Sequence, residues 1–151
     1  MTEPTRFEVR PIGVVRSPVK EPRPDGWEQV EAEIVVRPEL EAALDGLEGF
    51  SHVLVLFWFD RLPEAERETV LRVHPRRDER APLRGVFATR SSVRPNPIGL
   101  TLVRLLSRRG NVLRVRGLDA LDGTPVVDIK PYLPPYDSAE PIRLPDWVTE
   151  G

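Results

Sequence analysis

The sequence contains no cysteine, which excludes disulfide bonds, a thiol nucleophile and a Cys-ligated zinc site across its 151 residues. Histidine is almost as scarce. His52 and His74 stand in neither an H-x-x-x-H nor an H-E-x-x-H arrangement, so we expect no metal site. His52 opens an apolar stretch, where a lone histidine usually has a structural role.

Long apolar runs are also missing. No run approaches the ~20 residues that a membrane span needs, and the N-terminal stretch MTEPTRFEVR has no apolar signal region. We therefore expect a cytoplasmic protein with no membrane partner. The motifs G-x-G-x-x-G, Walker A and G-x-S-x-G are absent as well, so neither a Rossmann or P-loop nucleotide site nor a serine hydrolase is expected.

Lysine is rare, and the basic residues are unevenly distributed. Lys20 and Lys130 are the only lysines among 22 basic residues. Between Arg72 and Arg116 there are twelve arginines and two acids, a balance of +10, whereas the rest of the chain carries −12. Arginine suits bidentate binding of phosphate or carboxylate. The segment is either a solvated surface against which acidic segments fold or a surface for an anionic ligand.

Proline and glycine, at 17 and 10 residues, separate short β-rich runs along the chain. One helix is expected in RPELEAALDGLEGF (37–50), where Leu40, Leu44 and Leu47 share a face. Strands are expected at 7–17 (with a break at Pro11), 30–36, 51–59, 69–73, 85–89, in two runs joined at Arg109-Gly110-Asn111, and in TPVVDIKPYL (124–133). About seven short strands with one or two short helices predict a mainly β protein, a small barrel that forms a single domain over residues 1–151.

The stretch RSSVRPNPIGLT, Arg90 to Thr101, is too elaborate for a simple turn. Pro95 and Pro97 hold the backbone extended around Asn96. Such a stiff loop can aim polar side chains in fixed directions, as a binding site requires. The alternative is a wide connection in which Asn and Ser satisfy local backbone groups. The side chains that the loop would aim are Arg90, Ser91, Arg94 and Asn96.

A second polar cluster, GLDALDGTPVVDIKPYLPPYD, runs from Gly117 to Asp137. Its LDGTP segment is a natural turn, in which Asp122 has a structural role. Asp128 and Lys130 are two apart on an expected strand and therefore face the same side. Such a pair can equally be a surface ion pair worth under ~1 kcal/mol.

These two blocks, FATRSSVRPNPIGLT and GLDALDGTPVVDIKPY, resemble the signature blocks of the TrmO (TsaA-like, formerly UPF0066) family. PIGVVRSPVKEP and FSHVLVLFWF also match the family in order, so the resemblance runs from about Phe7 to Tyr136. It implies an S-adenosylmethionine-dependent tRNA methyltransferase that methylates N6 of threonylcarbamoyl-adenosine at position 37. It also implies a small non-Rossmann β-barrel that binds S-adenosylmethionine and forms a homodimer.

The resemblance further implies that the cofactor is bound by the loop after SPVKEP, the end of LFWFDR, the Arg90–Thr101 stretch and GLDA. Many members read P-R-Q-x where this chain has PDGWEQ. Longer bacterial members carry a small C-terminal domain that assists tRNA binding, which we expect this chain to lack. The implied cofactor-binding residues are Trp27, Glu28, Gln29, Asp60, Arg61, Arg90, Ser91, Thr101, Gly117, Leu118, Asp119 and Ala120.

Methyl transfer is an in-line displacement that depends on the positioning of donor and acceptor. Because N6 of the modified adenine must lose a proton, a carboxylate is expected nearby. Asp128 or Asp119 is the hypothetical base, and Asn96 is a further catalytic candidate. Arg94, Lys130 and Tyr132 are candidates for substrate binding, with Arg90 and Arg94 facing phosphates or the threonyl carboxylate.

The leading interpretation is thus a methyltransferase whose arginine-rich segment meets the anticodon stem-loop of tRNA. One alternative is a family member with a small-molecule acceptor. Another is a non-catalytic module that binds RNA or S-adenosylmethionine.

Overall fold

The computed structural model describes residues 5–149, so the first four and the last two residues of the expected domain lie outside the described residues. The chain divides into two compact units. The first unit contains residues up to Trp58 together with Leu100–Pro131, and the second contains Phe59–Gly99 and the residues from Tyr132 onward.

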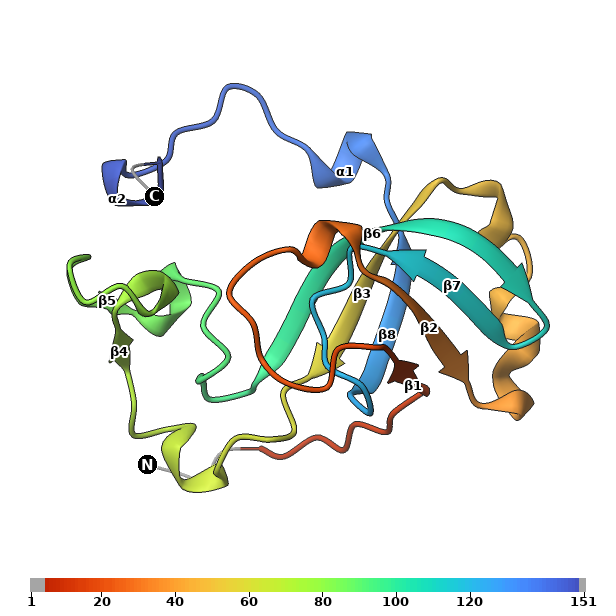
Figure 1. Ribbon diagram of the computed structural model, residues 1–151, viewed down its shortest axis with the longest axis horizontal. Coiled ribbons are helices and arrows are strands. Elements are labelled where there is room, and N and C mark those ends of the chain that lie inside the picture. The colour runs from red at the N-terminus through yellow and green to blue at the C-terminus, as the bar shows by residue number, and fades with distance from the viewer. Residues whose placement is uncertain (1–4, 150–151) are drawn as a thin grey trace. The chain divides into compact units, whose positions relative to one another are not determined.

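The first unit is a closed antiparallel barrel of six strands (Figure 1). Around the barrel the strands are β1 (Gly13–Arg16), β2 (Glu31–Val36), β7 (Val112–Arg116), β6 (Ile98–Arg109), β3 (His52–Trp58) and β8 (Pro125–Pro131). Pairing of Gly13 on β1 with Val126 on β8 closes it. The mainly β fold expected from the sequence is confirmed.

Alternation along the strands builds the barrel interior. On β2, Ala32, Ile34 and Val36 are buried while Glu31 and Glu33 lie outside. The almost continuously apolar β3 follows the same rule, because Val53, Val55 and Phe57 are buried and the residues between them are half-buried. Period-two alternation thus gives each strand one inward face, and these faces form a single core.

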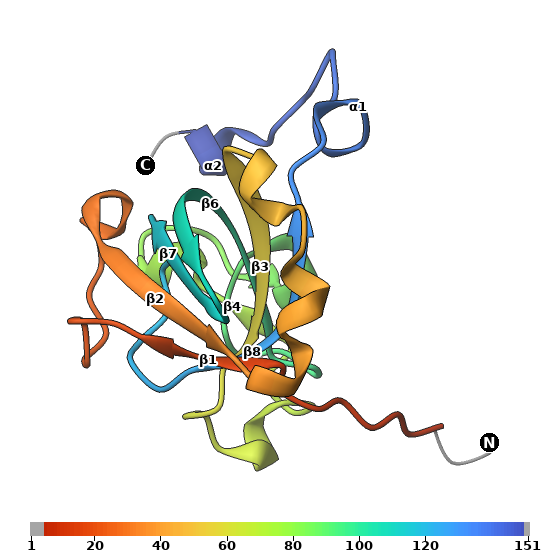
Figure 2. The ribbon, with the colours of Figure 1, turned by 90° about the vertical axis from the view of Figure 1, so that its right-hand side faces the viewer.

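The sequence predicts one helix over residues 37–50, but the structure has no α-helix there. Two 3-10 helices occupy the segment, η2 (Pro38–Leu44) and η3 (Leu47–Gly49), separated by Gly46 with a φ of +90°. Leu44 is the one fully buried residue of the two, so packing gives little support for a long α-helix, which is marginal at this length. Figure 2 shows these turns on the side of the barrel that faces the viewer.

Other expected boundaries also shift. The first strand begins at Gly13 rather than at residue 7, and the strand at 69–73 shrinks to β4 (Arg72–Val73). The prediction of a strand at 85–89 is wrong. The two-residue strand β5 (Arg84–Gly85) ends at Gly85, and the 3-10 helix η6 (Val86–Ala88) follows it. Val86 is buried there but Phe87 is 79% exposed, so only one residue of the apolar run packs into a core.

The second unit contains the two-stranded pair β4–β5 and short helices. A hydrogen bond from the Phe59 N–H to the Pro97 carbonyl, at 2.8 Å, joins the two ends of its segment 59–99. The remaining helices are η1 (Trp27–Gln29) in the first unit, and η4 (Glu64–Glu66), η5 (Pro75–Arg77), α1 (Pro134–Asp137) and α2 (Asp146–Thr149) in the second. None of the helices in residues 5–149 has the length and apolar character needed to cross a bilayer.

Candidate functional site

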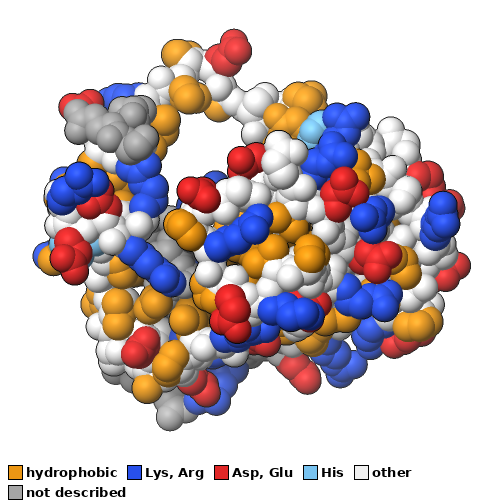
Figure 3. All heavy atoms as spheres, in the orientation of Figure 1, with side chains coloured by type: hydrophobic (Ala, Val, Ile, Leu, Met, Phe, Trp, Pro, Cys, Tyr) orange, Lys and Arg blue, Asp and Glu red, His pale blue; other side chains and the backbone are white. Residues whose placement is uncertain are grey.

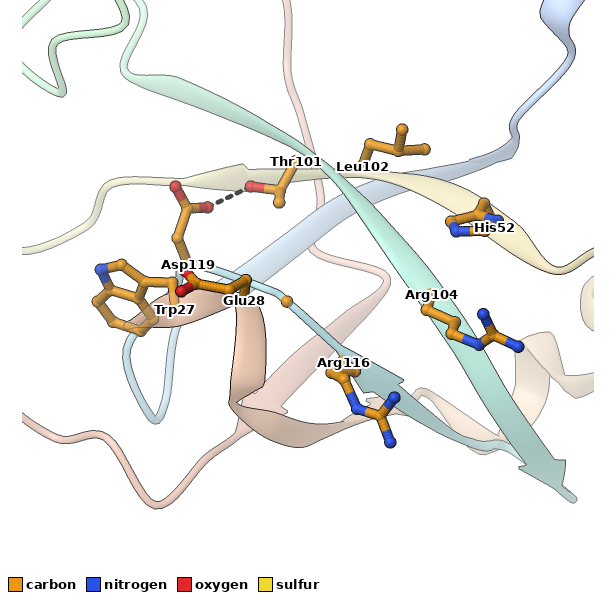
Figure 4. Close-up of a pocket in the computed structure, with 9 residues that line it drawn as sticks. Trp27, Glu28, His52, Thr101, Leu102, Arg104, Arg116 and Asp119 are labelled. Carbon is orange, nitrogen blue, oxygen red and sulfur yellow. Dashed lines mark hydrogen bonds between the residues drawn. The ribbon is translucent and has the colours of Figure 1, made fainter. Parts of the chain in front are cut away.

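An open pocket of about 470 Å³ lies on the first unit (Figure 4). This volume falls within the range of small-molecule sites. Most of its walls come from β6, the end of β7 and the loop that follows it, and the η1 segment. The lining residues are Trp27, Glu28, His52, Thr101, Leu102, Arg104, Arg116, Gly117 and Asp119.

Asp122 anchors the loop that leads from β1 to η1. Its Oδ1 accepts a hydrogen bond from the Ser17 N–H at 3.0 Å, and its Oδ2 accepts one from Lys20 Nζ at 2.9 Å. The Asp122 N–H donates in turn to the Val19 carbonyl at 2.9 Å. The turn LDGTP therefore fixes the start of the segment that carries Trp27 and Glu28 to the pocket.

Trp27 is held by its own loop. Its indole Nε1–H donates to the Arg23 carbonyl at 3.0 Å, and the Arg23 guanidinium lies 5.2 Å from the ring centroid. Gly26 precedes it with a φ of +81°, a left-handed conformation that favours glycine. The indole is half-buried at the pocket wall, whereas Gln29, also expected to bind cofactor, is exposed and does not line the pocket.

The GLDA segment contributes alternate residues. Gly117 has a φ of +96° and donates its N–H to the Val30 carbonyl at 2.9 Å, which brings the segment beside η1. Leu118 and Ala120 have buried side chains, so only their backbone can face a ligand. Asp119 is exposed in the pocket and accepts a hydrogen bond from the Thr101 hydroxyl.

The pocket is divided by charge. Figure 4 shows Glu28 and Asp119 beside Trp27, and Arg104 and Arg116 together away from them. The acidic end suits a cationic group, and the indole beside it suits a planar ring. The basic end suits an anionic group.

Asp128 and Lys130 lie elsewhere in the first unit, on β8. Asp128 Oδ1 accepts a hydrogen bond from the Ile129 N–H at 2.9 Å, and Oδ2 lies 3.1 Å from Lys130 Nζ. Neither residue lines the pocket. The same-face pairing expected from their spacing is present and engages Oδ2, while the Ile129 N–H engages Oδ1.

The remaining expected site residues belong to the second unit and are described apart from the pocket. Arg94 Nη1 donates to the carbonyls of Thr89 (3.2 Å) and Ser91 (2.9 Å), and its guanidinium lies over Phe87. The Ser91 hydroxyl accepts a hydrogen bond from the Val93 N–H at 3.2 Å. This loop is thus stiffened from within. Asp60, Arg61, Arg90 and Asn96 are exposed, and Tyr132 is half-buried.

Sequence reasoning did not assign four of the lining residues to the site: His52, Leu102, Arg104 and Arg116. Alternation with Leu113 and Val115 places Arg116 on the outside of β7, but it does not reveal which strand lies beside it. Within residues 5–149, no three His, Asp or Glu side chains are grouped as a metal site would require.

This chain is similar to known proteins of one family. The family profile described as the tRNA-methyltransferase O N-terminal domain matches residues 14–138. The chain is 54% identical to a probable S-adenosyl-L-methionine-binding protein of Methanothermobacter thermautotrophicus, over 87% of this chain and 94% of that protein. It is 44% identical to the tRNA (adenine(37)-N6)-methyltransferase of Escherichia coli, over 93% of this chain and 61% of that enzyme.

Solved structures give the same relationship. A crystal structure of TrmO from P. aeruginosa superimposes with a TM-score of 0.77 at 35% sequence identity. The match covers 97% of this chain and 63% of that one, so the chain spans less than two thirds of the solved protein.

Proposed function

This chain belongs to the tRNA-methyltransferase O N-terminal domain family, and we propose on that basis that it is an S-adenosylmethionine-dependent methyltransferase acting on N6 of adenosine 37 in tRNA. The observation that carries the proposal is the charge-divided pocket, in which Trp27, Glu28, Thr101 and Asp119 come together. The family resemblance implies a cofactor contact for each of these four residues.

The acidic end of the pocket fits S-adenosylmethionine. When bound, this cofactor supplies a methyl group on a positively charged sulfonium. The carboxylates of Glu28 and Asp119 offer opposite charge, and the indole of Trp27 offers a face for the adenine. The volume of about 470 Å³ is sufficient for a ligand of this class.

Asp119 is the residue best placed to take the proton from N6. Its Oδ1 is held by the Thr101 hydroxyl, and among residues 5–149 no donor occupies its Oδ2. Asp128 already uses both oxygens for the Ile129 N–H and the Lys130 ammonium. A general base needs a free lone pair in the site, so Asp119 is favoured of the two expected carboxylates.

We propose threonylcarbamoyl-adenosine as the modified base, with Arg90, Arg94, Lys130, Tyr132 and Asn96 as acceptor-side residues and the cytoplasm as the site of action. We also propose a homodimer. Leu100 and Leu102 on β6 are 44% and 45% exposed, and Leu102 also lines the pocket, so they form an apolar strip at the pocket edge for a second copy. Sedimentation equilibrium tests the dimer, and a monomer at all concentrations contradicts it.

A second candidate is a protein that binds S-adenosylmethionine but methylates another acceptor. It is favoured by one observation. The relative that this chain matches over 94% of its length is named for S-adenosyl-L-methionine binding, whereas the chain spans only 61% of the named tRNA methyltransferase.

Transfer of radiolabelled methyl groups from S-adenosylmethionine separates the two candidates. The acceptors are tRNA carrying threonylcarbamoyl-adenosine, the same tRNA with unmodified adenosine 37, and a protein-free metabolite extract. Label in the modified tRNA alone supports the first candidate. Label in the extract alone supports the second, and label in neither, with the cofactor bound, contradicts both.

A further inference from the structure

Two arginines stand directly opposite each other on neighbouring strands of the pocket wall. In the β6–β7 ladder, Arg104 is the partner of Arg116, and both side chains line the pocket. Facing side chains in such a pair are close, and like charges in that position destabilise a sheet. The pair therefore stands at a position where another residue type would favour folding.

Within residues 5–149, the carboxylates near the pair leave Arg104 without an ion-pair partner, since Glu31 is shared between Arg116 and Arg114. Glu31, opposite Arg116 on β2, lies 3.3 Å from Arg116 and 3.1 Å from Arg114. Hydrogen bonds from Arg116, which has the larger effect, and from Arg114 lower the pKa of the Glu31 carboxyl. Glu33 lies 3.7 Å from Arg16. Along the part of the chain that the structure describes, no carboxylate lies within ion-pair distance of Arg104.

A third nitrogen-bearing side chain lies beside the pair. The Leu105 N–H donates to the Ser51 carbonyl at 2.8 Å, one residue from Arg104 on β6 and one residue from His52 on β3. His52 lines the same pocket and its Nδ1 lies 2.7 Å from the Ser51 hydroxyl. Among the residues that line the pocket, this end carries Arg104, Arg116 and His52 and no carboxylate, while Glu31 lies next to the pocket at Arg116. Over the rest of the barrel surface, acidic and basic side chains are interspersed (Figure 3).

We propose that Arg104 and Arg116 form an anion subsite that binds a phosphate or carboxylate group of a ligand in this pocket. The subsite rests on the proposed function, which provides ligands with such groups: the RNA backbone and the carboxylate of the cofactor. Two guanidinium groups on adjacent strands present several N–H donors to one anion, and the anion relieves their repulsion. The acidic end at Glu28 and Asp119 disfavours an anion there, which fixes the ligand's direction.

Arg104→Gln tests the subsite, with Arg109→Gln as the matched control. Arg109 lies on the same strand, is exposed and does not line the pocket, so its loss removes the same charge outside the site. Two affinities are measured at equilibrium, one for S-adenosylmethionine by calorimetry and one for an anticodon stem-loop RNA by fluorescence anisotropy. The RNA affinity is measured between about 50 and 200 mM salt.

If the anion is an RNA phosphate, Arg104→Gln weakens RNA binding several-fold and reduces the salt slope by about 1. If it is the cofactor carboxylate, Arg104→Gln weakens S-adenosylmethionine binding several-fold and leaves the salt slope unchanged. In both cases Arg109→Gln has a smaller effect. The melting temperature of Arg104→Gln stays equal to or above that of the wild type, because a like-charge pair is removed.

Equal losses in the two variants, no loss in either affinity, or a wild type that binds neither probe overturns the subsite. A lower melting temperature of Arg104→Gln with unchanged affinities assigns the arginine to folding and also overturns it. Because both affinities are measured without turnover, the absence of methyl transfer contradicts the proposed function and leaves the subsite result standing.

Discussion

The hydroxyl of Thr101 on β6 donates a hydrogen bond to the carboxylate of Asp119 in the loop after β7. The two residues come from the two polar blocks that the sequence separates by a whole hairpin. The bond fixes the carboxylate at the acidic end of the pocket, beside Trp27 and Glu28. This hydrogen bond therefore links the Arg90–Thr101 stretch to the Gly117–Asp137 cluster within one pocket.

Replacing Asp119 by asparagine tests its role as proton acceptor. The amide keeps the shape of the side chain but cannot take a proton, so we expect the rate of methyl transfer to fall by roughly 10²-fold or more. Single-turnover transfer to the anticodon stem-loop RNA provides the measurement. Asp128→Asn is the control, expected to retain activity within a few-fold. The reverse ranking of the two variants assigns the base to Asp128.

Loss of the Thr101 hydroxyl leaves the Asp119 carboxylate without its donor. A hydrogen bond to a charged group contributes about 1.5–3 kcal/mol, so Thr101→Val is expected to slow transfer by roughly 10-fold or more. Thr101→Ser retains the hydroxyl and is expected to restore most of the rate. Equal rates for the Val and Ser variants show that the bond does not position the carboxylate.

Trp27 is expected to stack on the adenine of the cofactor. Stacking on an aromatic side chain contributes about 1–3 kcal/mol per base, so Trp27→Ala weakens S-adenosylmethionine binding by roughly 5- to 100-fold. Trp27→Phe retains a ring and is expected to lose less. Cofactor should quench the tryptophan fluorescence of the wild type and of Trp147→Phe, but not that of Trp27→Phe. Quenching that survives in Trp27→Phe places the adenine elsewhere.

Asp122 is expected to position the loop between β1 and η1, and thereby Trp27 and Glu28, although it does not line the pocket itself. Asp122→Ala removes the acceptor of the Ser17 N–H, and Ser17 is buried at 7% exposure. Removing the partner of such a group costs about 1–3 kcal/mol. We expect a lower free energy of unfolding and a weaker affinity for cofactor. Asp122→Asn retains one acceptor oxygen, so its affinity should lie closer to that of the wild type.

The lowered pKa of Glu31 predicts a pH-dependent contribution to stability. As the pH is lowered, the unfolded chain takes up the carboxyl proton at a higher pH than the folded chain does. The free energy of unfolding therefore decreases as the pH is lowered through that range. The advantage of the wild type over Glu31→Gln is therefore full at pH 7. It is lost as the pH drops below the ordinary glutamate value, through the lowered pKa of the folded state.

Melting temperatures measured from pH 7 down to the acid range check this dependence. Glu33→Gln is the matched control, because Glu33 shares the outer face of β2 and makes one longer ion pair with Arg16. A stability difference for Glu31→Gln that stays constant into acid contradicts the argument.

Secondary structure could be predicted where the hydrophobic pattern of a segment matched the residues that the fold buries. Ala32, Ile34 and Val36 alternate with acids, and the same residues face the barrel interior. The segment 37–50 has helical spacing, but only Leu44 is fully buried, so its helices remain 3-10. Period and propensity are local properties, whereas the extent of a helix depends on what its face can bury.

The candidate site was predicted in part. The motif resemblance correctly indicated the family. Five of the residues it implies line one pocket: Trp27, Glu28, Thr101, Gly117 and Asp119. The burial of Leu118 and Ala120 was not apparent, because a motif does not state which side chains of a segment face inward. The binding and catalytic roles of all these residues, in both units, stay predictions, as do the single-domain boundaries.

The sequence by itself determined the family, the mainly β class and the inward face of the strand at 30–36, because motifs and period-two alternation are properties of the residue order. Only the tertiary structure decided that Arg104 faces Arg116, that Glu31 is shared between Arg114 and Arg116, and that Asp122 holds the loop at Ser17. These relationships depend on strand order and register around a closed barrel. Both are set by packing between segments far apart in the chain, which no local pattern records.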